Sequence, residues 1–156
     1  MSITQTETGN AATGAYGLSG EGAEVVLSFA SGLPGFESST RFRLEEIGAQ
    51  FDPFCRIRSV TEPEICFTLV APGLLFPDYT IEIDEEHANQ LELATSEDAV
   101  VLAIVTLSAA PQPPSLNLLG PLAVNRRTWA AAQVVQYQSD YGTTVPIPVA
   151  AGPVDR

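Results

Sequence analysis

The sequence AVVLAIVTL, residues 99–107, is the longest apolar run in this chain of 156 residues. It is rich in β-branched residues, which fit a pleated and buried strand. Because apolar side chains occupy consecutive positions, the run predicts a strand that is buried on both faces. It is far shorter than the roughly 20 apolar residues that a membrane-spanning helix needs.

Shorter segments with strand character lie on both sides of this run. In residues 40–44, Phe42 and Leu44 alternate with Arg41 and Arg43, a period of two that is typical of a strand with one wet face. Gly and Pro, 12 residues of each, divide the chain into short segments and turns. The predicted strands comprise residues 24–30, 40–44, 54–59, 65–71, 79–83, 99–107, 116–118, 122–125 and 129–137.

This pattern predicts an all-β fold, a small antiparallel β-barrel or barrel-like sandwich with one short helix. A barrel is favoured because closure removes exposed strand edges. Asp84 can cap the helix, and the two glutamates that follow it suit the positively polarised first turn. We expect one domain, residues 22–141, between a flexible N-terminal tail, residues 1–21, and a loose, proline-rich C-terminal tail, residues 142–156.

Charge is the strongest bulk property of the chain. Nineteen Asp and Glu residues oppose seven Arg, there is no Lys, and the formal net charge is −12. Proteins bind nucleic acid by neutralising phosphates with Lys and Arg, so we expect no direct nucleic-acid binding, and an anionic membrane surface is disfavoured for the same reason. A basic protein partner would be attracted. The alternative is that the acidity only maintains solubility.

The residue types that usually carry catalysis or bind metals are scarce. Cys55, Cys66 and the single His87 cannot supply a four-ligand zinc site. His87 has no obvious nucleophile beside it in the sequence, and a phosphate-binding loop with its lysine is absent. We therefore predict no catalytic residue, no metal site and no cofactor, and interpret the protein as a binding protein rather than an enzyme. The cysteines are predicted to be buried free thiols, with a disulfide across a hairpin as the alternative.

Carboxylates are concentrated in residues 76–98, a segment without Arg or Lys that we call the acidic belt. Strand alternation places Glu82 and Asp84 opposite Ile81 and Ile83, so these charges are expected to point outward. The belt is either a solvated edge or a functional surface. As a functional surface it would dock a basic partner, or repel RNA and so keep it away from a bound partner. The candidate partner-binding residues are Asp78, Tyr79, Glu82, Asp84, Glu85 and Glu86.

Several short motifs occur in a fixed order along residues 24–141. They are GLPGFE (residues 32–37), PDY (77–79), AVVLAIVT (99–106), NLLGPLAVN (117–125) and QVV (133–135). In this order and spacing the chain resembles the FliW family of flagellar assembly factors, although Gly120 stands where that family has Ala. We interpret the motif residues as structural first, because Gly and Pro shape turns and Asn bonds to loop backbone. These residues are Gly32, Pro34, Gly35, Phe36, Asn117, Pro121 and Asn125.

The resemblance implies a function without catalysis. It implies that the protein binds flagellin in the cytoplasm and also binds CsrA, an RNA-binding regulator that blocks flagellin translation. When flagellin is exported, the free assembly factor would sequester CsrA, and flagellin synthesis would resume. The expected partners are therefore flagellin and CsrA. From the residues alone two alternatives stay open: a small-molecule-binding or hydrolytic β-barrel, and a structural subunit that self-assembles.

Overall fold

Strand β7 (Ala99–Thr106) is the centre of the fold, because it pairs with three other strands. The computed structural model describes residues 2–4, 25–46, 54–107, 112–137 and 139–147. The other strands are β1 (Ser2–Thr4), β2 (Val26–Phe29), β3 (Arg41–Glu46), β4 (Cys55–Ser59), β5 (Cys66–Val70), β6 (Thr80–Glu82), β8 (Ser115–Leu116), β9 (Leu122–Asn125), β10 (Ala130–Gln133) and β11 (Val145–Pro146). The helical segments are α1 (Glu85–Gln90) and two 3-10 turns, η3 (Pro72–Leu74) and η4 (Ser96–Asp98).

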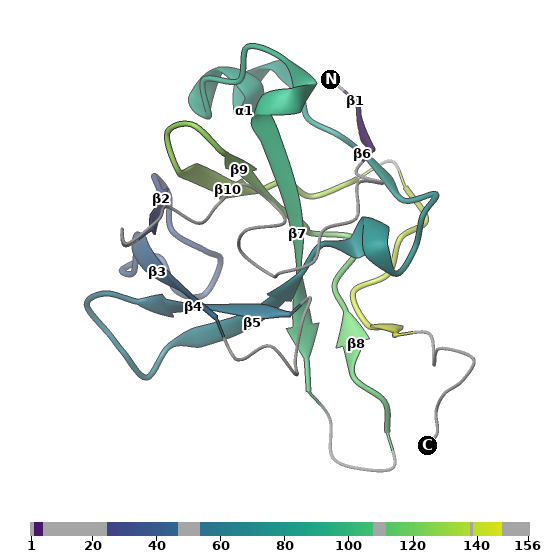
Figure 1. Ribbon diagram of the computed structural model, residues 1–156, viewed down its shortest axis with the longest axis horizontal. Coiled ribbons are helices and arrows are strands. Elements are labelled where there is room, and N and C mark those ends of the chain that lie inside the picture. Colours follow the sequence, from purple (N-terminus) through teal and green to yellow (C-terminus); the bar gives the residue numbers. More distant parts are fainter. Residues whose placement is uncertain (1, 5–24, 47–53, 108–111, 138, 148–156) are drawn as a thin grey trace.

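Seven strands close into a barrel, in the order β7-β5-β4-β3-β2-β10-β9, with β9 returning to β7 (Figure 1). The predicted all-β barrel with one short α-helix is therefore confirmed. One pairing departs from the antiparallel expectation, because β10 runs parallel to β2, with Ala130 opposite Ser28. The chain reaches this pairing by returning from β9 through a tight turn, in which the Trp129 carbonyl accepts a 2.9 Å hydrogen bond from the Ser28 amide.

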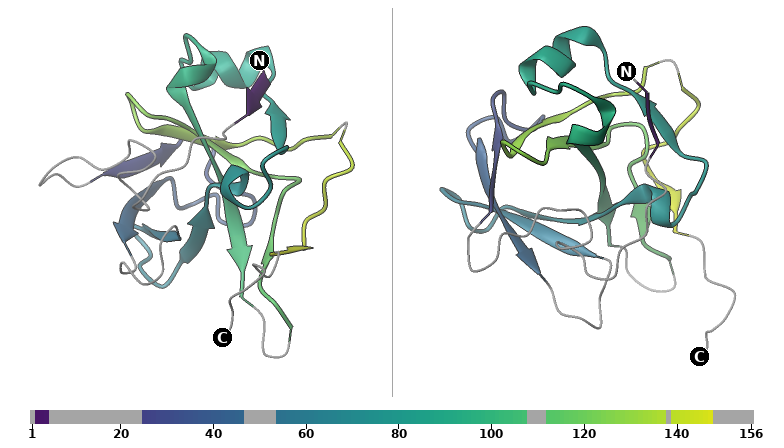
Figure 2. Two further views of the ribbon diagram at one scale, coloured as in Figure 1. Left: turned by 45° about the vertical axis from the view of Figure 1, so that its right-hand side comes forward. Right: turned by 45° about the horizontal axis from the view of Figure 1, so that its top comes forward.

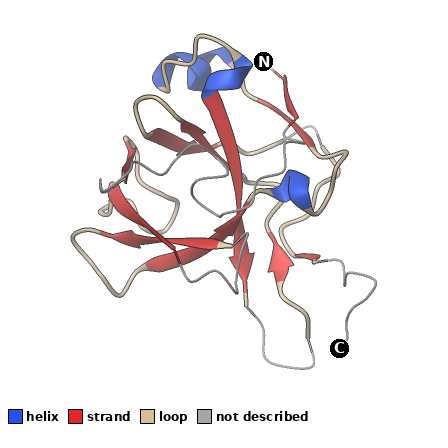
Figure 3. Ribbon diagram, viewed as in Figure 1, coloured by secondary structure: helices blue, strands red, loops and turns tan. Residues whose placement is uncertain are grey.

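Both faces of β7 are covered, as its sequence predicts. Val100 and Leu102 pack inside the barrel, in a core to which every barrel strand contributes. Val101 and Ala103 face the other way, into a second core beneath β6 and α1. Fully burying one large aliphatic or aromatic side chain contributes roughly 1.5–3 kcal/mol. These two apolar layers fix the position of the segments that cover the barrel, and α1 accordingly lies at one end of β7 (Figure 3).

The two chain ends add short strands outside the barrel. Residues 2–4 form β1, which pairs with β6 in a separate two-stranded sheet (Figure 2), so the expectation of a flexible tail is wrong for these three residues. Residues 5–24 lie outside the described residues. At the other end β11 pairs with β8, which corrects the expectation of a loose tail at residues 145–146. Residues 148–156 also lie outside the described part of the chain.

The GLPGFE segment forms a tight turn between β2 and β3. Gly32 and Gly35 have φ angles of 67° and 88°, in the left-handed region that other residues resist. A Cβ atom at Gly32 would lie 2.7 Å from the Cα atom of Glu37, so the position also lacks room for a side chain. Pro34 is exposed at the turn, and the Phe36 ring packs edge-on against Phe67, with centroids 5.4 Å apart. These residues therefore shape and pack the turn between β2 and β3.

Cys55 and Cys66 are both free thiols. They lie on neighbouring strands, but Cys55 is opposite Leu69 and Cys66 is opposite Arg58, so no cross-strand pair exists. Cys55 is buried as predicted, whereas Cys66 is exposed. The hairpin was correctly predicted, but its register separates the two sulfur atoms.

Candidate partner-binding groove

An open groove of about 820 Å³ lies between β6 with the start of α1 and the chain segment that follows β10. We call it the acidic groove. Four carboxylates line it, together with aliphatic and aromatic side chains and no Arg or Lys among its described lining residues. The lining residues are Thr80, Glu82, Ile83, Asp84, Glu85, Val134, Val135, Gln136, Tyr137, Ser139, Asp140 and Tyr141.

Two side chains hold the floor of the groove together. The Gln136 amide is buried, and it accepts a 2.8 Å hydrogen bond from the Glu82 amide nitrogen and donates a 3.0 Å bond to the Glu82 carbonyl. The Tyr141 hydroxyl accepts a 3.2 Å hydrogen bond from the Thr80 amide and donates a 3.0 Å bond to the Thr80 carbonyl. Along this edge of β6, side chains therefore take the place of a neighbouring strand. The sequence did not reveal either role, because both contacts join residues more than fifty positions apart.

The carboxylates of the groove come from both sides of it. Glu82 is exposed on β6, and Glu85 is exposed in the first turn of α1. Asp84 is the helix cap, as predicted, and its Oδ1 accepts a 2.7 Å hydrogen bond from the His87 amide and lies 2.9 Å from His87 Nδ1. The bond from the His87 amide lowers the pKa of Asp84, so this group is anionic at neutral pH. Asp140 adds a carboxylate that lies outside the predicted belt.

An exposed aromatic ring stands beside these charges. Tyr137 is 87% exposed, by far the most exposed aromatic residue among the large apolar side chains of the described chain. Val135 is half-buried next to it, and both line the groove. Carboxylates attract a cationic side chain, an aromatic face stabilises it further, and apolar neighbours accept its alkyl stem. The groove is thus suited to a protein segment that is both basic and apolar.

Only some of the predicted partner-binding residues line the acidic groove. Glu82, Asp84 and Glu85 line the groove, whereas Asp78 and Glu86 are exposed outside its lining. Tyr79 is buried, its hydroxyl donates a 2.6 Å hydrogen bond to the Leu118 carbonyl, and its ring lies 4.6 Å from that of Tyr141. Burial raises the pKa of Tyr79. Its nomination as a partner contact is therefore corrected: Tyr79 supports the groove from below.

His87 is not among the residues that line the acidic groove. It lines a separate pocket of about 230 Å³ beside the GLPGFE turn, smaller than the roughly 300–1,000 Å³ of typical ligand sites. Ser31 lines the same pocket, but no hydrogen bond joins it to His87 in the described structure. Among the described residues no group of three or more His, Cys, Asp or Glu could hold a metal ion, and no helix is long and apolar enough to cross a membrane.

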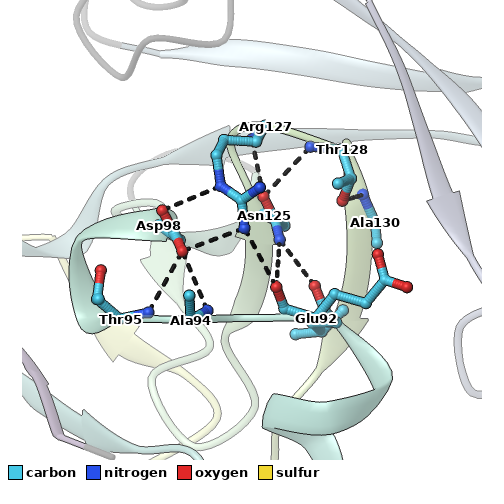
Figure 4. Close-up of polar contacts among 9 residues, drawn as sticks. Glu92, Ala94, Thr95, Asp98, Asn125, Arg127, Thr128 and Ala130 are labelled. Atoms are coloured by element: carbon cyan, nitrogen blue, oxygen red, sulfur yellow. Dashed lines mark hydrogen bonds and ion pairs between the residues drawn. The ribbon is translucent and has the colours of Figure 1, made fainter.

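Asn125 fixes the end of the acidic belt to the barrel (Figure 4). This buried residue donates from Nδ2 to the Leu91 and Glu92 carbonyls, at 2.8 Å and 3.2 Å. Its Oδ1 accepts from the amides of Arg127 and Thr128, at 2.8 Å and 3.2 Å. One side chain therefore satisfies four backbone groups of two different turns. Asn125 thus bonds to loop backbone, and the contact sets where α1 ends against β9.

The family comparison agrees with this motif geometry. The family model described as FliW protein matches residues 11–147. The chain belongs to the FliW family.

Individual members of the FliW family are similar over most of the chain. The flagellar assembly factor FliW of Bacillus subtilis (strain 168) is 34% identical over 124 residues, which cover 80% of this chain and 86% of that protein. The flagellar assembly factor FliW of Bacillus licheniformis is 35% identical over 121 residues, which cover 78% of this chain and 84% of that protein. A crystal structure of the flagellar assembly factor FliW superposes with a TM-score of 0.73 at 27% identity, covering 78% of this chain and 84% of that one.

The FliW motif NLLGPLAVN contains a second asparagine with a smaller role. Asn117 Oδ1 accepts a 2.9 Å hydrogen bond from the Gly120 amide, and the Gln133 side chain donates at 2.9 Å to the Gly120 carbonyl. The Pro121 carbonyl accepts from the Val134 amide at 2.8 Å. A Cβ atom at Gly120 would lie 2.6 Å from Gln133 Nε2. The departure from the alanine of the family pattern therefore leaves room for Gln133.

The far end of the acidic belt is paired rather than free. Asp98 lies 3.2 Å from both Nε and Nη2 of Arg127, and it accepts hydrogen bonds from the amides of Ala94 and Thr95 (Figure 4). The hydrogen bond from Arg127 lowers the pKa of Asp98. Although the belt contains no Arg or Lys, the fold brings Arg127 to it. Arg127 therefore offsets the charge of Asp98 at this end of the belt.

This pairing predicts a loss of stability in acid. Because the folded-state pKa values of Asp84 and Asp98 are lowered, the unfolded chain binds more protons, and the free energy of unfolding falls as the pH drops below about 4. Urea denaturation between pH 6 and pH 3 would measure this. Asp98→Asn should show a weaker dependence on pH than the wild type, and Arg127→Gln, which removes the group that lowers the pKa of Asp98, should do the same. Equal slopes in all three proteins would contradict the assignment.

Proposed function

We propose that this FliW-family protein is a non-catalytic flagellar assembly factor that acts in the cytoplasm by binding flagellin and the translational regulator CsrA. Bound to flagellin, it leaves CsrA free to block flagellin translation. After flagellin export, the released protein sequesters CsrA, and translation resumes. The proposal rests on the family to which the chain belongs and on the chemistry of the acidic groove. It needs neither a cofactor nor a metal ion.

The acidic groove is the observation that carries this proposal. A protein that binds RNA presents Lys and Arg to the phosphates, so CsrA offers charges opposite to those of Glu82, Asp84, Glu85 and Asp140. Opposite potentials speed the encounter of two proteins. The same carboxylates repel an RNA backbone. A protein docked at this groove would therefore hold CsrA and disfavour its RNA ligand at the same time.

Flagellin would use the apolar part of the same surface. An amphipathic helix binds a groove through apolar side chains spaced three and four residues apart. Val135 and Tyr137 offer apolar surface along the groove, and Ile83 lies at its floor. Because these residues and the carboxylates line the same groove, a flagellin helix and CsrA would compete for overlapping sites. This overlap is the physical basis of the proposed exchange of partners.

Gel filtration tests the proposal with the purified full-length protein and the flagellin and CsrA encoded in the same genome. We expect a complex with each partner to elute earlier than its components, and added flagellin to release CsrA. A ternary complex would contradict the shared site, and the absence of both complexes would overturn the proposed function. A hydrolytic or ligand-binding barrel would instead be revealed by a small molecule that raises the melting temperature.

A further inference from the structure

The segment that follows β10 continues that strand beyond the barrel. The backbone amides of Val134 and Gln136 donate hydrogen bonds to the carbonyls of Pro121 and Leu119, both at 2.8 Å. These two bonds keep the antiparallel register in which β10 pairs with β9. In Figure 1 the chain accordingly runs on from β10, below α1, toward β6. Residues 134–136 are thus an extended continuation of β10.

The other edge of this continuation has no neighbouring strand. On that side β10 pairs with β2, but the pairing ends where Ala131 lies opposite Phe29. The chain then turns away, and the Gly32 amide donates a 2.9 Å hydrogen bond to the Phe29 carbonyl. In the part of the chain that the structure describes, no group bonds to the backbone N–H or C=O of Val135 or Tyr137. Because adjacent residues of a strand direct these groups to opposite sides, both residues present them on the side that β2 has left.

The open edge, as we call the unpaired side of Val135 and Tyr137, borders two cavities. The pocket of about 230 Å³ lies between the GLPGFE turn and residues 131–133, and Val135 lines it as well. Val135 also lines the acidic groove, which continues past Tyr137 to Tyr141. Tyr137 is exposed and Val135 is half-buried. The two cavities therefore leave room beside the open edge for another chain segment.

The two faces of the open edge differ in chemistry. Gln136 points toward β6, where its side chain bonds to the backbone of Glu82, and the carboxylates of Glu82 and Glu85 lie on this face. Val135 and Tyr137 point to the opposite face and offer it apolar surface. A strand directs alternate side chains to opposite faces of its sheet. A segment paired here would therefore be complementary if basic residues alternated with apolar residues.

We propose that the open edge accepts an extended segment of a partner protein as an added β-strand. Unpaired N–H and C=O groups along a strand edge are a template for such pairing. The main-chain hydrogen bonds supply affinity, and the alternate side chains supply specificity. The inference rests on the proposed function, because it specifies how a basic partner is held at the acidic groove. It also gives the QVV motif, residues 133–135, the role of carrying β10 past the barrel.

The chemistry of the open edge favours a basic protein segment over two other occupants. Nucleic acid lacks the alternating N–H and C=O groups of a β-strand, and the carboxylates of the groove repel its phosphates. A second copy of this chain would bring a further formal net charge of −12 to a surface that is already acidic. A segment that is both basic and apolar meets neither obstacle.

Fluorescence anisotropy with a labelled heptapeptide of alternating Lys and Val tests the inference on the full-length protein. N-methylation of every second amide removes the N–H donors along one edge of the peptide and leaves its charge unchanged. We expect methylation of one set of amides to weaken binding at least about tenfold, because backbone hydrogen bonds are lost. Methylation of the other set, the matched control, should leave the affinity near that of the unmodified peptide.

A substitution on the protein provides a second test. Val135→Pro removes an N–H group of the open edge without changing any charge, and proline is tolerated at strand edges. We expect a melting temperature near that of the wild type and an affinity for the unmodified peptide at least about tenfold lower. Val135→Ala keeps the N–H group and should bind with nearly the wild-type affinity. If Val135→Pro does not fold, Tyr137→Pro makes the same test.

Four results would overturn the inference. They are the absence of peptide binding, equal affinities of the two methylated peptides, and undiminished binding by the folded proline variant. The fourth is dimerisation in analytical ultracentrifugation that Val135→Pro abolishes, which would assign the open edge to a second copy of the chain. If complexes with flagellin and CsrA still formed in gel filtration, the proposed function would stand and only the strand pairing would be rejected.

Discussion

Replacing Glu82, Glu85 and Glu86 together by glutamine is expected to slow the association with CsrA by about tenfold at low ionic strength. All three side chains are exposed, on β6 and in the first turn of α1. Their removal weakens the field that steers a basic partner toward the groove, without removing an apolar contact. The dependence of the association rate on salt should flatten as well, because fewer charges remain to be screened. Stopped-flow mixing at several salt concentrations measures both effects.

A matched control separates position from net charge. Glu64, Glu92 and Glu97 are also exposed and lie outside the groove lining. Changing these three residues to glutamine removes the same three charges from a net charge of −12. We expect this variant to associate at nearly the wild-type rate. Equal slowing in both variants would show that only overall charge matters, and an unchanged rate in the first variant would remove the acidic groove from the account.

The second large effect is expected at Asn125. Asn125→Ala should lower the free energy of unfolding by about 3 kcal/mol, because four backbone groups lose their partner in a buried site. This corresponds to roughly a hundredfold change in the ratio of folded to unfolded protein. Asn117→Ala is the natural comparison and should cost about 1 kcal/mol. Within the described part of the chain, the Asn117 side chain accepts one hydrogen bond, from the Gly120 amide.

Urea denaturation followed by tryptophan fluorescence can measure both variants. Trp129 is the single tryptophan of the chain and packs partly buried against the barrel core, so its emission reports unfolding. The slope with urea should stay the same, showing that only stability changed. If Asn125→Ala and Asn117→Ala lower the free energy of unfolding by the same small amount, the hydrogen bonds of Asn125 do not stabilise the contact between the end of α1 and β9 as described.

Local patterns were enough to predict the seven strands of the barrel but not how the barrel closes. The alternation in residues 40–44 and the apolar run of β7 each depend on neighbouring residues, so they can be read from the sequence. The parallel pairing of β10 with β2 joins segments about a hundred residues apart. No local signal encodes such a contact, because it is fixed by the whole path of the chain around the core.

The sequence likewise predicted only some of the residues that form the acidic groove. Glu82, Asp84 and Glu85 were found because strand alternation and helix capping are local rules. Gln136 and Asp140 were missed, because they reach β6 and the groove from the segment after β10. Arg127 was missed as a partner of Asp98 for the same reason. Tyr79 was misassigned because the strand pattern that buries it also places it next to the carboxylates.

Hydrogen–deuterium exchange of the CsrA complex tests the central claim most directly, since it reports where on this protein the partner binds. The acidic groove is formed by residues 80–85 and 134–141. The account predicts that amides in these two segments exchange more slowly in the complex, while those of β3 and β4 are unchanged. Protection confined to β3 and β4, or to the GLPGFE turn, would contradict the claim that the acidic groove is the site where CsrA docks.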